Sequence, residues 1–392
     1  MKSAISVLYR KALKRLLTLF YVFPIRRNRI IFCSYDTGVG YTCNPKYICE
    51  YLKKKDPGHY DLVWAFSDPE KWSRIRGIRG VRIHSVRWLY EMLTARVVVY
   101  NRIPESYLPK RPGQLVINTW HAGGAYKKVG FEKGELGELD LWRARQMNEY
   151  VDLFLTSSEA FTKSNIDGYR YTGEVMKSGM PRNDLFFRPS VVRKVRSRVR
   201  ESLGTGEEDL VVLYAPTFRR NVLDPKARSV TFPYQAAREA LAARFGTDAV
   251  RIWKREHHAY GLQDGEDEEA LDVSQYPDMQ ELLCAANILV TDYSSSIWDF
   301  SLRKKPCFLY VPDLDDYVGE DRGFFTPIEE WPGIICRDEE ALLNAFRHLD
   351  EEASAAKAEA ALRAMVSYED GHAAERVCRR IRETVFGKES AV

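Results

Sequence analysis

The sequence lacks several features that would place a protein in a well-known class. Its seven cysteines form no C-x-x-C pair, and no group of His, Cys and acidic residues has the spacing of a metal site. The motifs G-x-x-x-x-G-K-[ST] and G-x-S-x-G are also missing, which argues against P-loop NTPases and α/β-hydrolases. We therefore expect reduced thiols, a cytosolic compartment and no structural zinc.

No hydrophobic run is long enough to cross a bilayer. The most apolar uncharged stretch, residues 16–25, is far shorter than the roughly 20 residues that a span needs. It also lacks a cleavage site of the A-x-A type, so a secretory signal is not expected. The chain has 392 residues, 45% of them hydrophobic and 29% charged, which is enough for two substantial cores.

Acidic residues are absent from the first thirty positions, although the whole chain has a net charge of only +4. Lys and Arg alternate there with Leu, Ile and aromatic residues at helical spacing, up to Pro24. This pattern predicts a basic amphipathic helix that binds an anionic membrane surface. A helix packed on the protein body is the alternative. A nucleic-acid-binding arm is weaker, because no reading module follows it.

Short apolar runs with β-branched and aromatic residues predict two series of strands. The first series comprises residues 30–35, 60–66, 96–101, 115–120 and 152–157. The second series comprises residues 210–215, 250–254, 287–291, 307–311 and 333–336. Strands that alternate with helices form parallel sheets, so we expect an α/β fold with two doubly wound, Rossmann-like domains facing a central cleft.

An Arg-rich interruption at residues 188–208 separates the two series. Its bases at 193–200 predict an exposed helix or hinge with a solvated face, and residues 351–386 are predicted as helix. The expected segments are a basic membrane-surface segment at 1–29, α/β domains at 30–190 and 207–365, and a C-terminal helix and tail at 366–392.

Open α/β sheets bind ligands beyond the carboxyl ends of their strands, so polar residues at these ends are candidate site residues. His121 follows one such strand and is a candidate general base. Gly123 and Gly124 allow a backbone to approach a ligand closely, and Lys127 adds positive charge. A structural histidine that caps a turn is the alternative.

Two stretches in the second half are candidate phosphate sites. Arg255 and His257 follow a strand and could hold a diphosphate, or they form a surface polar cluster. Ser294, Ser295 and Ser296 open a helical segment, where hydroxyl and N–H groups bind phosphate, although simple N-capping is the alternative. Further candidates near strand ends are Arg182, Thr217, Arg219, Asp292 and Arg322.

Taken in order, these motifs resemble the CDP-glycerol glycerophosphotransferase family, the teichoic acid primases and polymerases of bacterial cell walls. The resemblance is carried by residues 120–130 (WHAGGAYKKVG), 179–184 (GMPRND), 214–219 (YAPTFR), 255–257 (REH), 291–296 (TDYSSS), 316–325 and 368–376 (YEDGHAAER). Two departures stand out. The chain has Trp-His-Ala-Gly-Gly where much of the family has Trp-His-Gly-Thr-Pro, and His257-His258 where the family often has His-Pro.

The resemblance implies a GT-B-like fold, with an acceptor-side domain at 30–190 and a CDP-donor-binding domain at 207–365. It implies transfer of a polyol phosphate from CDP-glycerol or CDP-ribitol to a lipid-linked acceptor, with release of CMP. Glycerol phosphate is the favoured polyol phosphate. The acceptor would be an undecaprenyl-type saccharide or a polyol phosphate chain. The family's essential histidines fall on His121 and His257, and its donor-phosphate serines on 294–296, with Arg255 and Arg322 beside them.

No cofactor is expected, and a need for a divalent metal is left open. The expected location is peripheral, on the cytoplasmic face of the cell membrane, without a nucleic-acid partner. Two other functions stay open at this point. One is a GT-B glycosyltransferase with a nucleotide-sugar donor, and the other is a non-enzymatic, basic, membrane-associated scaffold.

Overall fold

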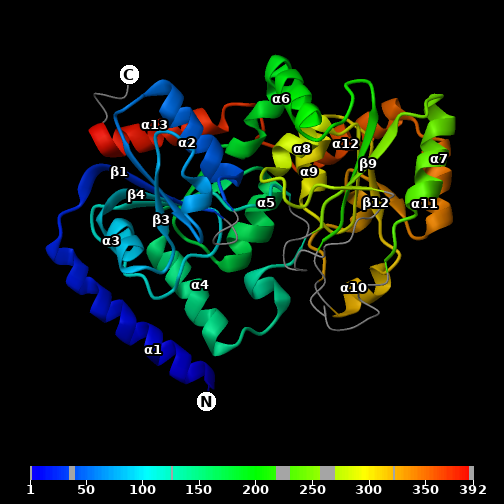
Figure 1. The fold of residues 1–392 in the computed structure, drawn as a ribbon. Helices are drawn as coiled ribbons and strands as arrows, with labels where there is room; N and C mark the ends of the chain where they lie inside the picture. The colour runs from blue at the N-terminus through cyan, green and yellow to red at the C-terminus, as the bar shows by residue number, and fades with distance from the viewer. Residues whose placement is uncertain are drawn as a thin grey trace. The chain divides into compact units, whose positions relative to one another are not determined.

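The computed structural model describes residues 2–34, 40–124, 127–217, 230–256, 270–320 and 323–387. The chain divides into two compact units, each of which is described by itself. Unit 1 comprises Met1–Ala122, Lys128–Asp184 and Tyr368–Val392, and unit 2 comprises Gly123–Lys127 and Leu185–Ser367. Both units are built from a parallel sheet with helices on its two faces (Figure 1).

Unit 1 has a parallel sheet of seven strands among its described residues, in the order β3-β2-β1-β4-β5-β6-β7. The strands are β1 (Arg26–Cys33), β2 (Asp61–Phe66), β3 (Arg79–Arg82), β4 (Ala95–Tyr100), β5 (Leu115–Asn118), β6 (Leu153–Thr156) and β7 (Glu174–Lys177). In β1, residues 30–33 are all buried, as expected for a central strand covered on both faces. The strand order reverses between β1 and β4, which places the switch point of this sheet there.

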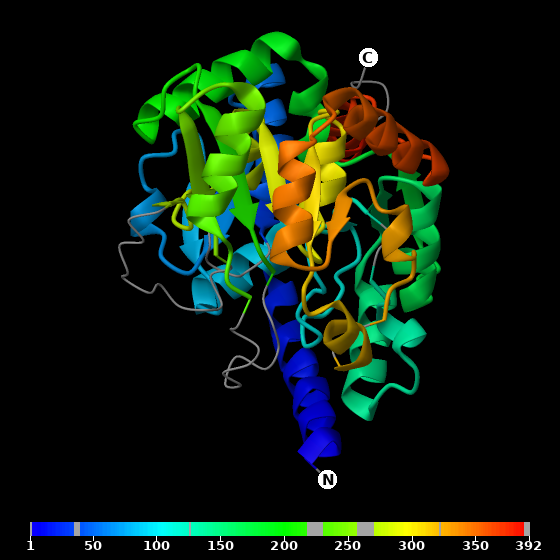
Figure 2. The same cartoon turned by 90° about the vertical axis from the view of Figure 1, so that its right-hand side faces the viewer.

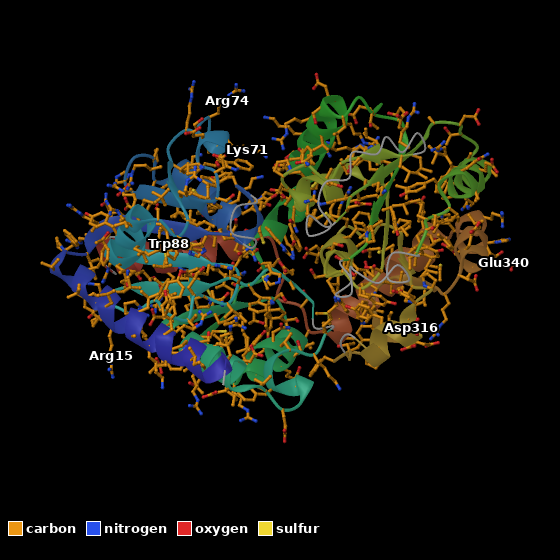
Figure 3. The ribbon with its side chains drawn as sticks, turned by 60° about the horizontal axis from the view of Figure 1, so that its bottom comes forward. Arg15, Lys71, Arg74, Trp88, Asp316 and Glu340 are labelled. Carbon is orange, nitrogen blue, oxygen red and sulfur yellow. The ribbon has the colours of Figure 1, made fainter. Side chains whose placement is uncertain are left out.

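The helices of unit 1 come from both ends of the chain. They are α1 (Lys2–Leu17), α2 (Cys43–Lys55), α3 (Val86–Thr94), α4 (Glu138–Tyr150), α5 (Glu159–Phe161) and α13 (Ala373–Phe386). One face of the sheet packs against α2 and α13, where Ile48 and Ile381 enter a shared core. On the other face, Trp88 of α3 is buried (Figure 3). The last helix of the chain therefore completes the first α/β unit.

Unit 2 has a parallel sheet of six strands within the part that the structure describes, in the order β10-β9-β8-β11-β12-β13. The strands are β8 (Leu210–Ala215), β9 (Val250–Lys254), β10 (Leu271–Asp272), β11 (Ile288–Thr291), β12 (Cys307–Tyr310) and β13 (Ile334–Cys336). The order reverses between β8 and β11, so these two strands flank the switch point.

Helices cover both faces of this second sheet. They are α6 (Pro189–Ser202), α7 (Tyr234–Phe245), α8 (Met279–Ala285), α9 (Ser296–Ser301), α10 (Leu314–Glu320), α11 (Glu339–Arg347) and α12 (Glu351–Ala364). Leu241 of α7 and Phe346 of α11 pack on one face, where the two helices lie side by side (Figure 2). Helices α8 and α9 contact the sheet, and α6 and α12 pack on them. The predicted pair of doubly wound α/β domains is confirmed.

The ten predicted strands are all present, most of them within one or two residues of their predicted bounds. Three further strands, β3, β7 and β10, were not predicted. They are short, lie at sheet edges and expose charged side chains, so their sequences carry no apolar run.

Two predictions about helices need correction. The bases of α6 were expected on a solvated face, but Arg200 is fully buried. Its guanidinium donates to the carbonyl oxygens of Ala285 and Asp209 and to Oδ1 of Asn287. The tail at 351–386 was predicted as helix throughout, but α12 and α13 are separate. Val366 and Gly371 between them adopt left-handed φ angles of 53° and 83°.

Helix α1 lies against α4 along one side of unit 1 (Figure 1). Val7 and Leu17 are buried, Lys14 pairs with Glu149, and the Lys11 ammonium lies over the Trp142 ring. The predicted helix is therefore present, and one of its faces packs on the protein body. No helix among the described residues has the length and apolar character needed to span a bilayer.

Candidate functional site

The carboxyl edge of the sheet in unit 1 carries His121 on a turn that directly follows β5. Trp120 within this turn has a left-handed φ of 50°, which is rare for a bulky residue and costs about 1–3 kcal/mol. The turn is held by hydrogen bonds on both sides of Trp120. Oδ1 of Asn118 accepts from the Trp120 N–H at 2.9 Å, and Nδ2 of Asn44 donates to the carbonyl oxygens of Thr119 and Trp120 at 3.1 and 2.9 Å.

The imidazole of His121 is half-buried and has a fixed orientation. Its ring lies over the Trp120 indole, with centroids 4.9 Å apart and planes at 25°. Nδ1 is 2.8 Å from the carbonyl oxygen of Asn101, the residue that follows β4. A carbonyl only accepts, so Nδ1 carries the proton in the neutral ring and Nε2 carries the lone pair. This is the tautomer that a general base needs.

The segment that contains Arg182 supports the His121 turn through hydrogen bonds. Nη1 of Arg182 donates to the carbonyl oxygen of His121 at 2.7 Å, and the Arg182 N–H donates to Oδ1 of Asn44 at 3.1 Å. Arg182 is buried, so within unit 1 it holds the backbone of the turn. Its predicted role in lining a cleft stays a prediction.

The motifs at 179–184 and 368–376 are far apart in the sequence but are joined by hydrogen bonds next to Arg182. The Glu369 carboxylate accepts from the Met180 N–H at 3.1 Å and from Nδ2 of Asn183 at 3.0 Å. Asp184 accepts from the N–H groups of Ala373 and Ala374, at 2.9 and 2.8 Å, and so caps the first turn of α13. The motifs at 179–184 and 368–376 therefore form one supporting structure for the His121 turn.

In unit 2, the residues after β8 and β11 meet at the switch point. Oγ1 of Thr291 donates to the carbonyl oxygen of Ala215 at 2.6 Å. The buried Asp292 carboxylate accepts from the Thr217 N–H at 2.9 and 3.0 Å and from the Tyr293 N–H at 2.5 Å. Thr217 and Asp292 thus lie together where open α/β sheets bind ligands.

The three predicted serines follow Asp292 and Tyr293. Oγ of Ser294 accepts from the Ser296 hydroxyl at 2.9 Å and from the Ser296 N–H at 3.3 Å. Ser295 makes no side-chain capping bond and is half-buried at the start of α9. Simple N-capping by Ser295 is therefore not what the structure shows, and phosphate binding by these serines stays a prediction.

Arg255 follows β9, the neighbour of β8. Its N–H donates to the carbonyl oxygen of Tyr214 at 2.9 Å, and Nη1 donates to the carbonyl oxygen of Tyr276 at 2.8 Å. Burial lowers the pKa of Arg255 to about 10, against the opposing effect of the Asp278 carboxylate. The guanidinium therefore stays charged at neutral pH. His257, Arg219 and Arg322 lie outside the described residues.

The glycines after His121 belong to unit 2. A Cβ on Gly124 would lie 2.0 Å from Cδ1 of Trp298 on α9, so only glycine fits against this indole. Lys127 forms an isolated antiparallel bridge with Phe324, and its ammonium is 5.4 Å from the centre of the Tyr317 ring. Gly124 therefore packs closely against Trp298 within unit 2. The predicted close approach of a ligand to Gly123 and Gly124 stays a prediction.

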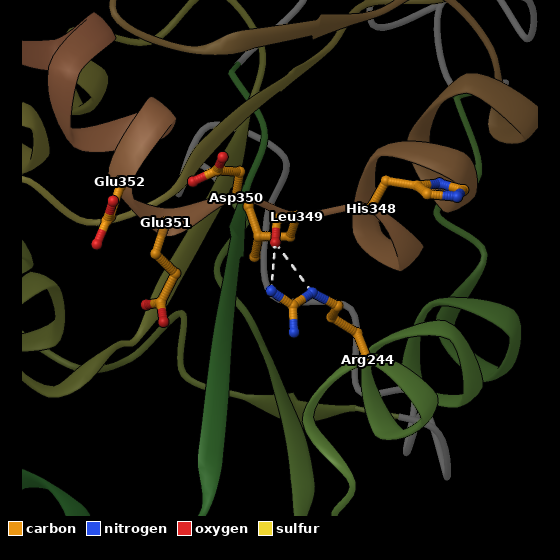
Figure 4. A pocket seen from close by; sticks show the side chains of 6 residues that line it. All are labelled: Arg244, His348, Leu349, Asp350, Glu351 and Glu352. Carbon is orange, nitrogen blue, oxygen red and sulfur yellow. Dashed lines mark hydrogen bonds between the residues drawn. The ribbon is translucent and has the colours of Figure 1, made fainter.

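A separate pocket of about 440 Å³ lies at the end of α7 in unit 2 (Figure 4). It is lined by Arg244 and by residues 348–352, and Arg244 donates from Nε and Nη2 to the carbonyl oxygen of Leu349. None of the predicted site residues lines it. Among the described residues, no three His, Cys, Asp or Glu side chains are placed to hold a metal ion.

Asn44, Asn101 and Glu369 were not predicted as site residues. Glu369 lies in the motif at 368–376, and Asn44 lies in the stretch after the first predicted strand, but their hydrogen bonds join segments far apart in the sequence. Asn101 is fully buried, and its backbone carbonyl sets the tautomer of His121. A polar residue at the carboxyl end of a predicted strand was the one signal that could have indicated it.

Comparison with known proteins identifies the family. Residues 15–383 match the model of the family described as CDP-Glycerol:Poly(glycerophosphate) glycerophosphotransferase. The chain is 28% identical over 362 residues to a teichoic acid poly(glycerol phosphate) polymerase of Bacillus spizizenii, covering 88% of this chain and 91% of the relative. It is 28% identical over 373 residues to a teichoic acid glycerol-phosphate transferase of Staphylococcus aureus, covering 91% of this chain and 93% of the relative.

A ribitol-phosphate enzyme and a solved structure are also similar. A teichoic acid ribitol-phosphate primase of Bacillus spizizenii is 26% identical over 365 residues, with 91% of each chain covered. The wall teichoic acid polymerase TagF has the same fold, with a TM-score of 0.82 at 24% identity over 99% of this chain and 98% of that chain. These findings confirm the predicted GT-B-like fold and the predicted class of transferase, over the two alternatives. The chain belongs to the CDP-glycerol:poly(glycerophosphate) glycerophosphotransferase family.

Proposed function

We propose that this protein moves a polyol phosphate from a CDP-polyol to a hydroxyl of a lipid-linked acceptor or of a growing teichoic-acid-like polymer, with release of CMP. Glycerol phosphate is the favoured unit, because the matching family model and two of the similar relatives name glycerol phosphate. Ribitol phosphate is the second choice, on the similarity to the ribitol-phosphate primase. A TagF structure of the same fold was soaked with CDPG.

The observation that carries the proposal is the geometry of His121. Its Nδ1–H group points to the Asn101 carbonyl, so Nε2 can accept the proton of an incoming hydroxyl. The hydroxyl oxygen bonds to the β-phosphorus of the donor as the bond from that phosphorus to the bridging oxygen breaks. CMP leaves with the electron pair of that bond. Removal of the hydroxyl proton by a positioned base typically contributes about 10²–10⁴-fold to the rate.

The donor diphosphate requires groups that compensate its negative charge. Arg255 supplies a charged guanidinium after β9, and Ser294, Ser295 and Ser296 supply hydroxyl groups after β11. His257 and Arg322, outside the described residues, are proposed for the same role. We expect no cofactor, since phosphoryl transfer depends on positioning and electrostatics more than on covalent chemistry by the protein.

The acceptor is proposed to be lipid-linked because α1 presents an apolar surface to solvent. Ile5, Leu8 and Leu16 are 61%, 69% and 60% exposed, although the opposite side of the same helix packs on the protein. Arg15 is exposed on α1 and points away from unit 1 (Figure 3). Apolar side chains flanked by bases bind the headgroup region of an anionic leaflet. We therefore propose peripheral binding at the cytoplasmic face of the membrane.

A donor screen tests the proposal. The purified protein is incubated with a lipid-linked polyol phosphate acceptor analogue and with CDP-glycerol, CDP-ribitol or a UDP-sugar, with Mg²⁺ or with EDTA. We expect CMP release that depends on the acceptor, fastest with CDP-glycerol and retained in EDTA. UDP release from a UDP-sugar without CMP release would contradict the proposal. Loss of turnover in EDTA would contradict the expectation that no metal is needed.

A further inference from the structure

We infer that Asn44 is a positioning residue of the transfer reaction, because its side chain fixes the turn that carries His121. The inference rests on the proposed function, in which His121 accepts the proton of the incoming hydroxyl. Asn44 lies in the first turn of α2, more than seventy residues before His121 in the sequence, and its side chain is fully buried.

One amide group joins three segments of unit 1. Nδ2 of Asn44 donates to the carbonyl oxygens on the two sides of Trp120, at 3.1 Å to Thr119 and 2.9 Å to Trp120 itself. Oδ1 accepts from the Arg182 N–H at 3.1 Å. Asparagine presents two donors and an acceptor in one plane, and aspartate of the same size presents acceptors alone. The site therefore selects the amide by its donors.

The turn needs this support because Trp120 is held in the left-handed region. At a φ of 50° a tryptophan is strained, and such strain persists only where the surroundings fix the conformation. Both carbonyl groups next to the strained residue are bonded to Asn44. Without those donors, the Thr119 carbonyl loses the Asn44 amide, and the Trp120 carbonyl keeps the Thr119 hydroxyl as a donor at 3.1 Å. The turn can then relax toward an ordinary φ.

Relaxation of the turn would move the base. The peptide that leaves Trp120 sets the direction of His121, whose backbone carbonyl accepts from Arg182 and whose Nδ1–H donates to Asn101. The imidazole also rests on the Trp120 indole. A change at Trp120 therefore moves the ring off its stacking partner and changes the Nδ1 bond that sets its tautomer. A misplacement of about 1 Å in a reacting group can cost about 10²-fold in rate.

The test is a double-mutant cycle on CMP release from CDP-glycerol, with a lipid-linked acceptor analogue and single-turnover conditions for slow variants. For Asn44→Ala we expect kcat to fall about 10²-fold while KM for CDP-glycerol changes less than about threefold. In the His121→Ala background, the same substitution should have no further effect, because Asn44 acts through His121. Asn44→Asp, which keeps the volume but loses the donors, should be at least as damaging as Asn44→Ala.

Asn148→Ala is the matched control. Asn148 of α4 uses both ends of its amide in unit 1, donating to the Ala144 carbonyl at 3.3 Å and accepting from the Thr172 N–H at 2.9 Å. Its loss should lower the melting temperature and leave kcat unchanged. If Asn44→Ala gives no folded protein, Asn44→Ser, which retains one hydroxyl donor, replaces it in the cycle.

Two results would overturn the inference while His121→Ala still lowers kcat by about 10²–10⁴-fold. One is a kcat for Asn44→Ala within about twofold of the parent, and the other is an equal loss from Asn44→Ala in both backgrounds, which would indicate a structural role alone. Normal turnover of His121→Ala would be a different result. It would refute the role of His121 in the proposed function, and the role of Asn44 with it.

Discussion

The two units have the same strand order around their switch points but carry different chemistry at the carboxyl edges of their sheets. The order β3-β2-β1-β4-β5-β6 in unit 1 corresponds to β10-β9-β8-β11-β12-β13 in unit 2. Unit 1 presents an oriented imidazole after β5, and unit 2 presents serine hydroxyls and backbone amides after β8 and β11. The shared topology determines where a site forms, and the residues after each strand determine what it can do.

The two edges also share a way of holding their loops. In unit 1 the buried Asn44 amide donates to the carbonyls of one post-strand turn. In unit 2 the buried Asp292 carboxylate accepts from the N–H groups of two such segments. One unit uses an amide to hold a strained tryptophan, and the other uses a carboxylate to hold two loop segments.

The largest expected effect is on kcat and comes from replacing His121, the proposed general base in unit 1. His121→Ala should lower kcat by about 10²–10⁴-fold, because the step that removes the hydroxyl proton loses its acceptor. CMP release under saturating CDP-glycerol measures it. His348→Ala in unit 2 is the control, since His348 also places Nδ1 near a backbone carbonyl, that of Asn344 at 3.0 Å. A comparable loss from His348→Ala would remove the distinction between the two units.

The next effect concerns the exposed apolar surface of α1, which belongs to unit 1. Leu8→Glu should weaken binding to vesicles of anionic lipid about 10–100-fold, since burying one leucine contributes about 1.5–3 kcal/mol. Turnover with a soluble acceptor should not change. Vesicle co-sedimentation measures the binding, with Val191→Glu on α6 as an equivalent change at an exposed position of unit 2. Equal weakening of vesicle binding by both variants would contradict a specific role of α1 in membrane binding.

A smaller effect is expected at the edge of unit 2. Ser295→Ala should raise KM for CDP-glycerol about tenfold with kcat little changed, because a hydrogen bond to a charged group contributes about 1.5–3 kcal/mol. Ser202→Ala removes a hydroxyl that donates to the Val199 carbonyl on α6 and should leave KM as it is. A fall in kcat at unchanged KM would indicate that Ser295 acts in the chemical step and not in donor binding.

The smallest effect is on acid stability and concerns a charge network of unit 1. Burial raises the pKa of Asp61, but hydrogen bonds from Arg29 and Arg79 outweigh it, and the pKa lies below its ordinary value of 3.8. The unfolded chain therefore takes up this proton at a higher pH than the folded chain does. The stabilisation is present above that ordinary value and is lost as pH falls through the folded-state pKa.

Urea unfolding at pH 5 and pH 3 measures this loss. Asp61→Asn should show a shallower decline of the unfolding midpoint between the two pH values than the parent protein. Asp140→Asn, which removes an exposed pair with Arg143, should decline as steeply as the parent. An unchanged slope for Asp61→Asn would show that its ion pairs do not contribute to acid stability.

Much of the fold could be predicted because buried parallel strands are apolar along their whole length. The central strands can be recognised in the sequence as continuous apolar runs. In β4, for example, Val97, Val98 and Val99 are all buried. The edge strand β7 does not, since its residues expose Glu174 and Lys177 to solvent. Arg200 looked like a surface base because only the structure shows the carbonyl groups that surround it.

The site was predictable in part for the same physical reason. His121 and the serines could be found because each lies a few residues beyond the end of a strand, and that position is visible in the sequence. The support behind His121 was not visible, because its hydrogen bonds join Asn44, Arg182 and Glu369 across long sequence separations. A left-handed φ at Trp120 likewise has no signal in a tryptophan's own sequence context.

The return of the chain to unit 1 at Tyr368 has a consequence for biosynthesis. The segment that carries Arg182 is hydrogen-bonded to Glu369 and to the start of α13, and these partners leave the ribosome only after all of unit 2. A nascent chain that ends before these residues contains the strands of the first sheet. It lacks Glu369 and the residues of α13 that support the segment behind the His121 turn. Unit 1 is therefore the first domain to begin folding and the last to be completed. A chain that stops before Tyr368 would contain all of unit 2 but would lack these supports of the His121 turn.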